Sequence, residues 1–320
     1  MRCPKCQFDH ELQTTECLKC GIVFSRYQAA VDANAKQPAP AVPMVEGPAR
    51  LSPAEPLKGR SGDARKELKY RLLALPLALL AAYWMTSTGL RIAAAMLAMV
   101  LHESGHAITA WLTGRWAVPL LWVTMHGEER SWWIVLILAS AICLAGFLAW
   151  RAKRWGWVCA AGAVLLGQLT FLSLPNPGAL IIFGGDGGAL VLATVLMAAF
   201  YAPRESALYK NWGMRWGLLA IGALTFMHVF RTWSGPIEEL PFGEIEGVNL
   251  SDPSLLTEMY GRSVTQLIHR YLRLATICLM ALLALYVWGL VSAYLESRRA
   301  AAQPDSTIPE FPAIKSQVIE

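Results

Sequence analysis

Long runs of apolar residues, separated by short polar breaks, fill most of the chain from Tyr70 onward. The runs predict helices over residues 71–89, 91–114, 132–150, 156–174, 187–203, 214–233 and 270–295. Apolar stretches of about 18 residues or more are typical of helices that cross a bilayer. The pattern therefore predicts an all-α polytopic membrane protein with about six or seven transmembrane helices.

Three breaks between these runs have distinct compositions. Residues 115–131 contain Pro119 and Gly127 and end in charged residues, which predicts a re-entrant hairpin or a loop. Residues 175–188 are rich in glycine and proline and predict poor helix, which survives at membrane depth only where protein or water surrounds it. Residues 234–262 form an acidic loop with six acidic residues and one arginine.

The composition strengthens the membrane interpretation. Of 320 residues, 55% are hydrophobic and only 16% are charged, whereas an ordinary soluble domain has about 25% charged residues. The net charge of +5 is modest. Basic residues gather just before and at the start of the first apolar run, at Lys58, Arg60, Arg65, Lys66, Lys69 and Arg71.

That basic cluster is typical of a cytoplasmic flank, so we expect a multi-pass integral membrane protein with its N-terminus in the cytoplasm. The cluster has no interleaved aromatic residues, and we expect no nucleic-acid partner. Residues 1–20 are polar and hold four of the seven cysteines, so they do not form a secretory signal peptide.

Composition also divides the chain into four parts. Residues 1–27 form a cysteine module, and residues 28–69 form a Pro/Ala-rich linker that we expect to be disordered. Residues 70–298 form the transmembrane domain. Residues 299–320 form a polar tail, also expected to be disordered.

The cysteine module contains two CxxC pairs, Cys3 with Cys6 and Cys17 with Cys20. Each pair offers two thiolates from one tight turn, and two such turns give the tetrahedral sulfur set that suits Zn²⁺. We predict a structural zinc ribbon, whose metal supplies most of the folding free energy of so small a module. A redox dithiol is the alternative. Ribbons of this kind often bind a protein partner.

A second candidate metal site is the HExxH motif at His102, Glu103 and His106. Residues four apart lie on one face of a helix, so both imidazoles can reach one ion, while Glu103 can address a water bound to it. The motif interrupts an apolar run, where ionisable residues are costly and usually functional. The alternative is three polar residues that face a water-filled cavity without a metal.

A catalytic zinc needs a third protein ligand and one open position. Asp186 is the best candidate, because it lies in the glycine-rich stretch 184–188 between two apolar segments. The alternative is that Asp186 only caps the following helix. His228 and Glu238 are lesser candidates for the third ligand.

The sequence 102–106 (HESGH), with Pro175-Asn176-Pro177 and then Asp186-Gly187 downstream, resembles the site-2 protease family of intramembrane metalloproteases. The resemblance covers roughly residues 90–205. Gly185 stands where that family usually has leucine. The resemblance implies that His102, His106 and Asp186 bind a catalytic zinc.

It also implies that Glu103 is the catalytic base and that Asn176 helps to hold the substrate or its reacting carbonyl. The expected function is hydrolysis of peptide bonds in a membrane-anchored protein substrate. Two zinc ions are expected, one catalytic and one structural. We expect the substrate backbone to lie beside residues 115–127 as an added strand.

Two alternatives remain. One is a cytoplasm-facing membrane zincin with a different third ligand, a glutamate, and the other is a non-catalytic membrane adaptor that binds a partner through its ribbon.

Overall fold

The computed structural model describes residues 57–204, 206–243 and 250–302, with a few positions near the N-terminus. The chain divides into two compact units, Met1–Leu57 and Lys58–Glu320, and each is described by itself. The elements from residue 57 onward are α2 (Leu57–Thr86), α3 (Arg91–Leu112), β1 (Ala117–Pro119), β2 (Thr124–His126), α4 (Trp132–Arg151), α5 (Trp155–Leu172), α6 (Gly178–Ala198), η1 (Ala199–Tyr201), α7 (Ala207–Lys210), α8 (Trp212–Ser234), η2 (Ile237–Glu239), α9 (Asp252–Glu258) and α10 (Val264–Ala302).

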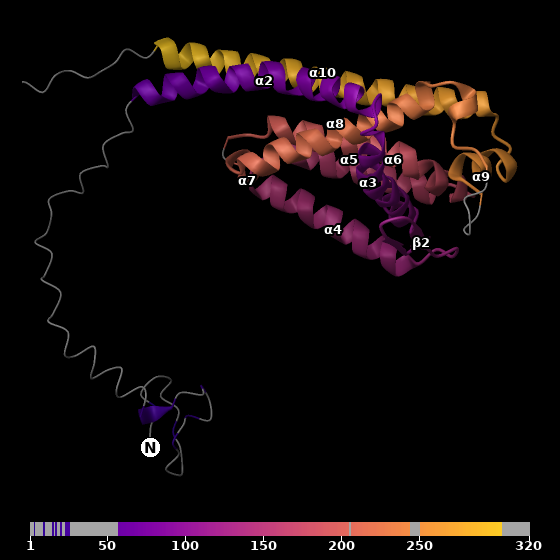
Figure 1. Ribbon diagram of the computed structural model, residues 1–320. Coiled ribbons are helices and arrows are strands. Elements are labelled where there is room, and N and C mark those ends of the chain that lie inside the picture. Colours follow the sequence, from indigo (N-terminus) through magenta and orange to yellow (C-terminus); the bar gives the residue numbers. More distant parts are fainter. Residues whose placement is uncertain are drawn as a thin grey trace, which may run out of the picture. The chain divides into compact units, whose positions relative to one another are not determined.

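Seven helices in the described part of the chain are long and apolar enough to cross a bilayer: α2, α3, α4, α5, α6, α8 and α10 (Figure 1). This number agrees with the predicted polytopic, mainly helical architecture. In the most apolar 18-residue stretch of α6, half of the residues are buried, whereas in the corresponding stretches of α4 and α5 only 6% are buried. Helix α6 is therefore central, whereas α4 and α5 pack mainly on each other and expose large apolar side chains, as lipid-facing helices do.

Glycines allow α3 and α6 to cross in backbone contact. A Cβ atom on Gly105 of α3 would overlap the carbonyl oxygens of Gly184 and Gly185 on α6. A Cβ on Gly188 would lie 2.5 Å from Cα of Gly105. Small residues are the usual means of close helix packing in a membrane. This crossing brings the HExxH motif of α3 against the glycine-rich stretch around Asp186.

The same crossing corrects one prediction about the fold. Residues 175–188 were expected to be poor helix, but α6 begins at Gly178 and runs through the glycines without a break. A glycine costs about 1 kcal/mol in an exposed helix. In a membrane the backbone has no water to bond with, so a helix satisfies its polar groups internally. The close packing of α6 on α3 offsets the cost of the glycines.

The two terminal helices are longer than their apolar runs. Helix α2 begins at Leu57, so residues 57–69 of the predicted disordered linker are helical. Helix α10 extends to Ala302 and includes residues 299–302 of the predicted disordered tail. Both extensions are rich in good helix formers, which continue a helix beyond the apolar stretch. The rest of the predicted linker and tail lies outside the described residues.

Helices α2 and α10 lie antiparallel along one side of the second unit (Figure 1). The Tyr286 hydroxyl on α10 donates a hydrogen bond to the carbonyl oxygen of Leu72 on α2, at 3.0 Å. A buried ion cluster joins α2 to α8: the guanidinium of Arg215 lies 2.6 and 3.0 Å from the two carboxylate oxygens of Glu67. Arg71 donates to the same carboxylate at 2.7 Å.

Residues 115–131, expected to form a re-entrant hairpin or a loop, contain a short antiparallel β-hairpin. Strands β1 and β2 pair with Ala117 opposite His126 and Pro119 opposite Thr124. The indole of Trp111 on α3 donates a hydrogen bond to the carbonyl oxygen of Ala117, at 3.0 Å. The hairpin is therefore fixed against the helix that carries the HExxH motif.

Candidate metal centre

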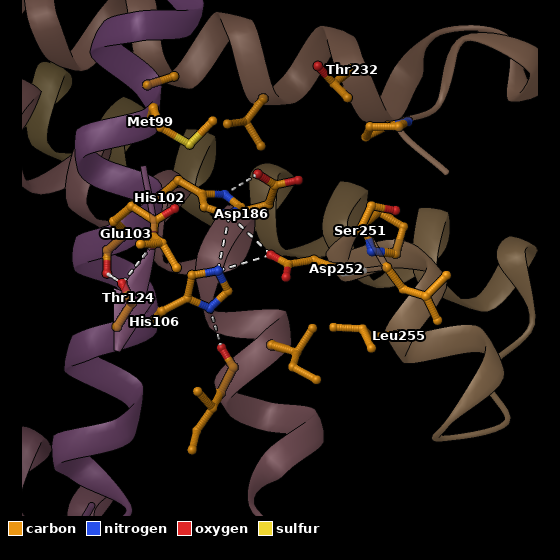
Figure 2. Close-up of a pocket in the computed structure, with 18 of the residues that line it drawn as sticks. Met99, His102, Glu103, His106, Thr124, Asp186, Thr232, Ser251, Asp252 and Leu255 are labelled. Carbon is orange, nitrogen blue, oxygen red and sulfur yellow. Dashed lines mark hydrogen bonds and ion pairs between the residues drawn. The ribbon is translucent and has the colours of Figure 1, made fainter. Parts of the chain in front are cut away.

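The two histidines of α3 present the same ring nitrogen to one point (Figure 2). His106 Nδ1 lies 2.8 Å from the carbonyl oxygen of Ile181, and a carbonyl can only accept, so Nδ1 carries the proton. His102 Nδ1 lies 2.9 Å from Asp186 Oδ1 and donates to that carboxylate. In their neutral form both imidazoles therefore keep a lone pair on Nε2, and the two Nε2 atoms lie 3.0 Å apart.

A third possible metal-ligand atom, a carboxylate oxygen of Asp252, reaches the same point (Figure 2). Asp252 is the first residue of α9. Asp252 Oδ2 lies 3.1 Å from His102 Nε2 and 2.9 Å from His106 Nε2. These three residues form a group whose ligand atoms all lie within 4.8 Å of one another. Their spacing is that of a two-histidine, one-carboxylate metal site.

Asp186, the expected third ligand, contacts the other ring nitrogen of His102, Nδ1. Its carboxylate accepts from His102 Nδ1, the ring nitrogen that faces away from His106, and from the indole N–H of Trp233 at 2.7 Å. The structure thus brings Asp186 to the site beside a histidine and not among the converging atoms. A carboxylate in this place fixes the tautomer and orientation of a ligating imidazole.

Two features of the donor group fit a metal ion. With neutral imidazoles, three atoms with lone pairs face one another, and among the described residues no group donates a well-directed hydrogen bond to Asp252 Oδ2. A cation relieves this repulsion. The three separations of 2.9–3.1 Å are close to the roughly 3.4 Å between ligands of a tetrahedral ion with bonds of about 2.1 Å.

The second feature is the space beside the donors. A Cβ atom on Gly185 would lie 2.6 Å from His106 Nε2 and 2.7 Å from His102 Nε2. A side chain at this position would fill the place where the donors converge. The glycine at position 185 therefore leaves space beside both Nε2 atoms.

Burial raises the pKa of the Asp252 carboxyl group, but protonated imidazoles of His102 and His106 beside it lower that pKa below the ordinary range. Asp252 therefore stays ionised whether imidazolium protons or a metal ion balance its charge. An ionised carboxylate is the form that binds a metal ion. Removing the imidazoles would leave this charge partly buried without a partner.

Glu103, the residue after His102, is held in place by the hairpin. Its side chain is 5% exposed. The hydroxyl of Thr124 on β2 lies 2.7 Å from Glu103 Oε2 and 2.8 Å from the Glu103 carbonyl oxygen, and can donate to either (Figure 2). A carboxylate fixed by one hydrogen bond keeps its other oxygen for a second partner.

A cavity of about 910 Å³ contains the whole group. His102, Glu103, His106, Asp186 and Asp252 all line it. Asn176, the predicted substrate-binding residue, lies on its wall, and so does His228, whereas Glu238 does not line it. The other polar side chains on its wall include Arg91, Arg115, Thr124, His126, Glu128, Arg231, Thr232, Glu239, Ser251 and Tyr260.

Three residues of this site were missed in the sequence: Asp252, Thr124 and Trp233. Asp252 is one of six acids in the 234–262 loop, and its only local signal is a helix start, with Ser251 before it and Pro253 after it. Thr124 and Trp233 have no local signal, because their roles depend on contacts across the fold.

The N-terminal cysteines also converge as far as they are described. The ligand atoms of Cys3, Cys17 and Cys20 lie within 4.8 Å of one another, and Sγ of Cys3 lies 3.8 Å from Sγ of Cys20. Cys6, the fourth predicted ligand, lies outside the described residues. Thiol groups at this spacing are able to hold one metal ion.

Comparison of the chain with protein-family models, with curated proteins and with solved structures finds no match.

Proposed function

We propose that this protein is a membrane-embedded zinc metalloprotease that hydrolyses peptide bonds of membrane-anchored protein substrates. One observation carries the proposal: two imidazoles and a carboxylate converge beside a buried glutamate, in a cavity within a bundle of apolar helices. Ionisable groups in such a setting are costly and are usually retained for chemistry. The resemblance of residues 102–106 and 175–187 to the site-2 protease family supports the same reaction.

His102, His106 and Asp252 would hold the catalytic ion. When bound, zinc supplies a water of lowered pKa and polarises a carbonyl group. Glu103, held by Thr124, acts as the general base and later gives the proton to the leaving amine. Asn176 lies on the cavity wall, and its proposed role is to bind substrate backbone.

The hairpin would position the substrate. Trp122, Val123 and Thr124 line the cavity, and among the described residues β1 and β2 pair only with each other, so each has an edge without a strand partner. A helical substrate hides its carbonyls in hydrogen bonds, and binding as an extended strand exposes one of them. Cys3, Cys6, Cys17 and Cys20 would hold a second, structural zinc, in a ribbon that binds a cytoplasmic protein partner.

The test uses native membranes that contain wild-type chain or the Glu103→Gln variant. We expect at least one membrane protein to accumulate uncut in the variant, while the purified variant keeps its zinc. If membranes with the wild-type chain and membranes with the variant contain the same protein fragments, the proposal is wrong. His102→Ala serves as a second inactive form that loses the cavity ion.

A second candidate is a membrane zincin that cleaves substrates in the aqueous phase. One observation favours it: Asp252 lies on α9, which belongs to the segment between two spans and not to a span. The cleavage position separates the two candidates. Cuts within the apolar segment of a substrate support intramembrane proteolysis, and cuts only in its soluble flank support the zincin.

A further inference from the structure

A chain of side-chain contacts leads from α8 to the metal-facing histidine. Trp233, near the end of α8, is 1% exposed, and its indole N–H donates to Asp186 Oδ2 at 2.7 Å. The other oxygen of the same carboxylate, Oδ1, accepts from His102 Nδ1 at 2.9 Å. Each carboxylate oxygen thus has one directed donor, and the carboxylate is fixed in both position and rotation.

The indole itself is held by an aromatic stack from three helices. Its ring lies 4.0 Å from that of Tyr271 on α10, with an angle of 25° between the planes. The Tyr271 ring lies 4.3 Å from that of Phe183 on α6, at 16°. Trp233 therefore has little freedom to turn, because its partners are anchored on other elements of the core.

The two histidines differ in what orients them. His106 Nδ1 is fixed by a backbone carbonyl, that of Ile181, which no substitution at a distant side chain removes. His102 Nδ1 is fixed only through Asp186, and Asp186 in turn through Trp233. The orientation of one ligand therefore depends on a tryptophan on another helix.

We propose that Trp233 and Asp186 are positioning residues of the metal centre. They hold His102 in the tautomer and orientation that presents Nε2 beside His106 and Asp252. This inference rests on the proposed metal site and assigns Asp186 to the support of a ligand. Without the indole N–H, Asp186 Oδ2 loses its donor, and the carboxylate turns away from the position that aligns the His102 ring.

The experiment measures Co²⁺ binding to the full-length chain in detergent or nanodiscs. Cobalt bound by cysteine thiolates shows sulfur-to-metal charge-transfer absorption, whereas cobalt bound by imidazole and carboxylate shows only weaker visible bands. The two sites are therefore read separately in one sample. Affinity at the cavity site is measured by competition with a chelator.

Trp233→Phe keeps an aromatic ring and removes the N–H. We expect it to weaken Co²⁺ binding at the cavity site about 10- to 100-fold, the usual effect of removing an outer partner of a ligand, and to change the visible spectrum. The matched control is Trp216→Phe on the same helix, since the indole nitrogen of Trp216 is buried without a hydrogen-bond partner among the described residues. The control should bind Co²⁺ as the wild type does.

Asp186→Asn tests the same inference without changing the aromatic stack. We expect it to keep one cavity Co²⁺ per chain, with weakened affinity and an altered spectrum. Equal Co²⁺ affinity and spectra in Trp233→Phe and Trp216→Phe would overturn the inference. So would complete loss of cavity Co²⁺ in Asp186→Asn, because Asp186 would then be a ligand.

Failure of the inference is distinct from failure of the proposed function. A wild-type chain that binds no Co²⁺ outside the cysteine site would overturn both. A wild-type chain that binds cavity Co²⁺, with no effect of Trp233→Phe, would overturn the positioning role alone.

Discussion

At the scale of single residues, the site shows how two aspartates next to one imidazole take different roles. Asp186 accepts from His102 Nδ1, whereas Asp252 faces Nε2 of both histidines. The sequence predicted the pair of histidines, because helical periodicity places residues four apart on one face. It did not predict Asp252, since no periodicity relates a residue on α9 to one on α3.

The role of Asp252 leads to a prediction about metal content. Asp252→Ala removes one of three ligand groups, so the cavity site should lose its zinc at stoichiometric zinc concentration. Glu258→Ala is the control, because it removes an exposed acid from the same short helix. Elemental analysis of the purified full-length variants measures the outcome. Unchanged zinc in Asp252→Ala would show that another group completes the site.

The contact between Thr124 and Glu103 leads to a second prediction. Thr124→Val removes the hydroxyl that holds the proposed base and keeps a β-branched residue in the strand, so cleavage should fall on the order of tenfold, a part of the 10²–10⁴ that a general base contributes. Thr124→Ser restores the hydroxyl and should recover most of the rate. Cleavage of a substrate identified from the Glu103→Gln membranes is the assay. Equal rates for the valine and serine variants would contradict this role.

At the scale of elements, the crossing of α3 and α6 decides where the site forms. The seven apolar helices could be predicted, because each is a local property of composition. The continuous helix through residues 178–188 could not, because local propensity disfavours glycine there and only packing against Gly105 offsets it. The hairpin could be predicted as a break in the helical pattern, but its contact with Glu103 is a tertiary feature.

This crossing predicts a strong effect of one methyl group. In Gly105→Ala the new Cβ meets backbone oxygens of α6, which side-chain rotation cannot relieve, so stability should fall by about 1–3 kcal/mol or more. The control is Gly162→Ala on α5, where a Cβ meets nothing within 4 Å. Thermal unfolding in detergent measures both. A Gly105→Ala chain as stable as Gly162→Ala would show that the helices do not cross in this way.

At the scale of the whole molecule, the buried ion cluster fastens α2 to the core of the second unit. Glu67 and Arg215 are 4% and 2% exposed, and Arg71 lies beside them at 6%. The sequence suggested only that Arg71 belongs to a basic flank, because Arg215, the other arginine on the Glu67 carboxylate, lies far along the chain on α8. Burial of these charges is tolerated because each carboxylate oxygen has a charged or hydroxyl donor.

The cluster predicts that Glu67→Gln is strongly destabilising. It leaves two buried arginines without a negative partner, which costs about 3–5 kcal/mol when one member of a buried pair is removed. Glu296→Gln is the control, because Glu296 pairs with Arg204 at the surface and is 47% exposed, where a pair contributes about 0–1 kcal/mol. The unfolding temperatures of the two variants in the same detergent test this difference, and equal temperatures would contradict it.

The proposed function requires a metal ion inside the helix bundle, in addition to one at the N-terminal cysteines. The zinc content of the full-length chain and of His106→Ala, purified in parallel, tests this requirement. We expect two zinc ions per wild-type chain and one per variant chain, with the cysteine-bound ion retained. Equal zinc content in the two proteins would contradict it.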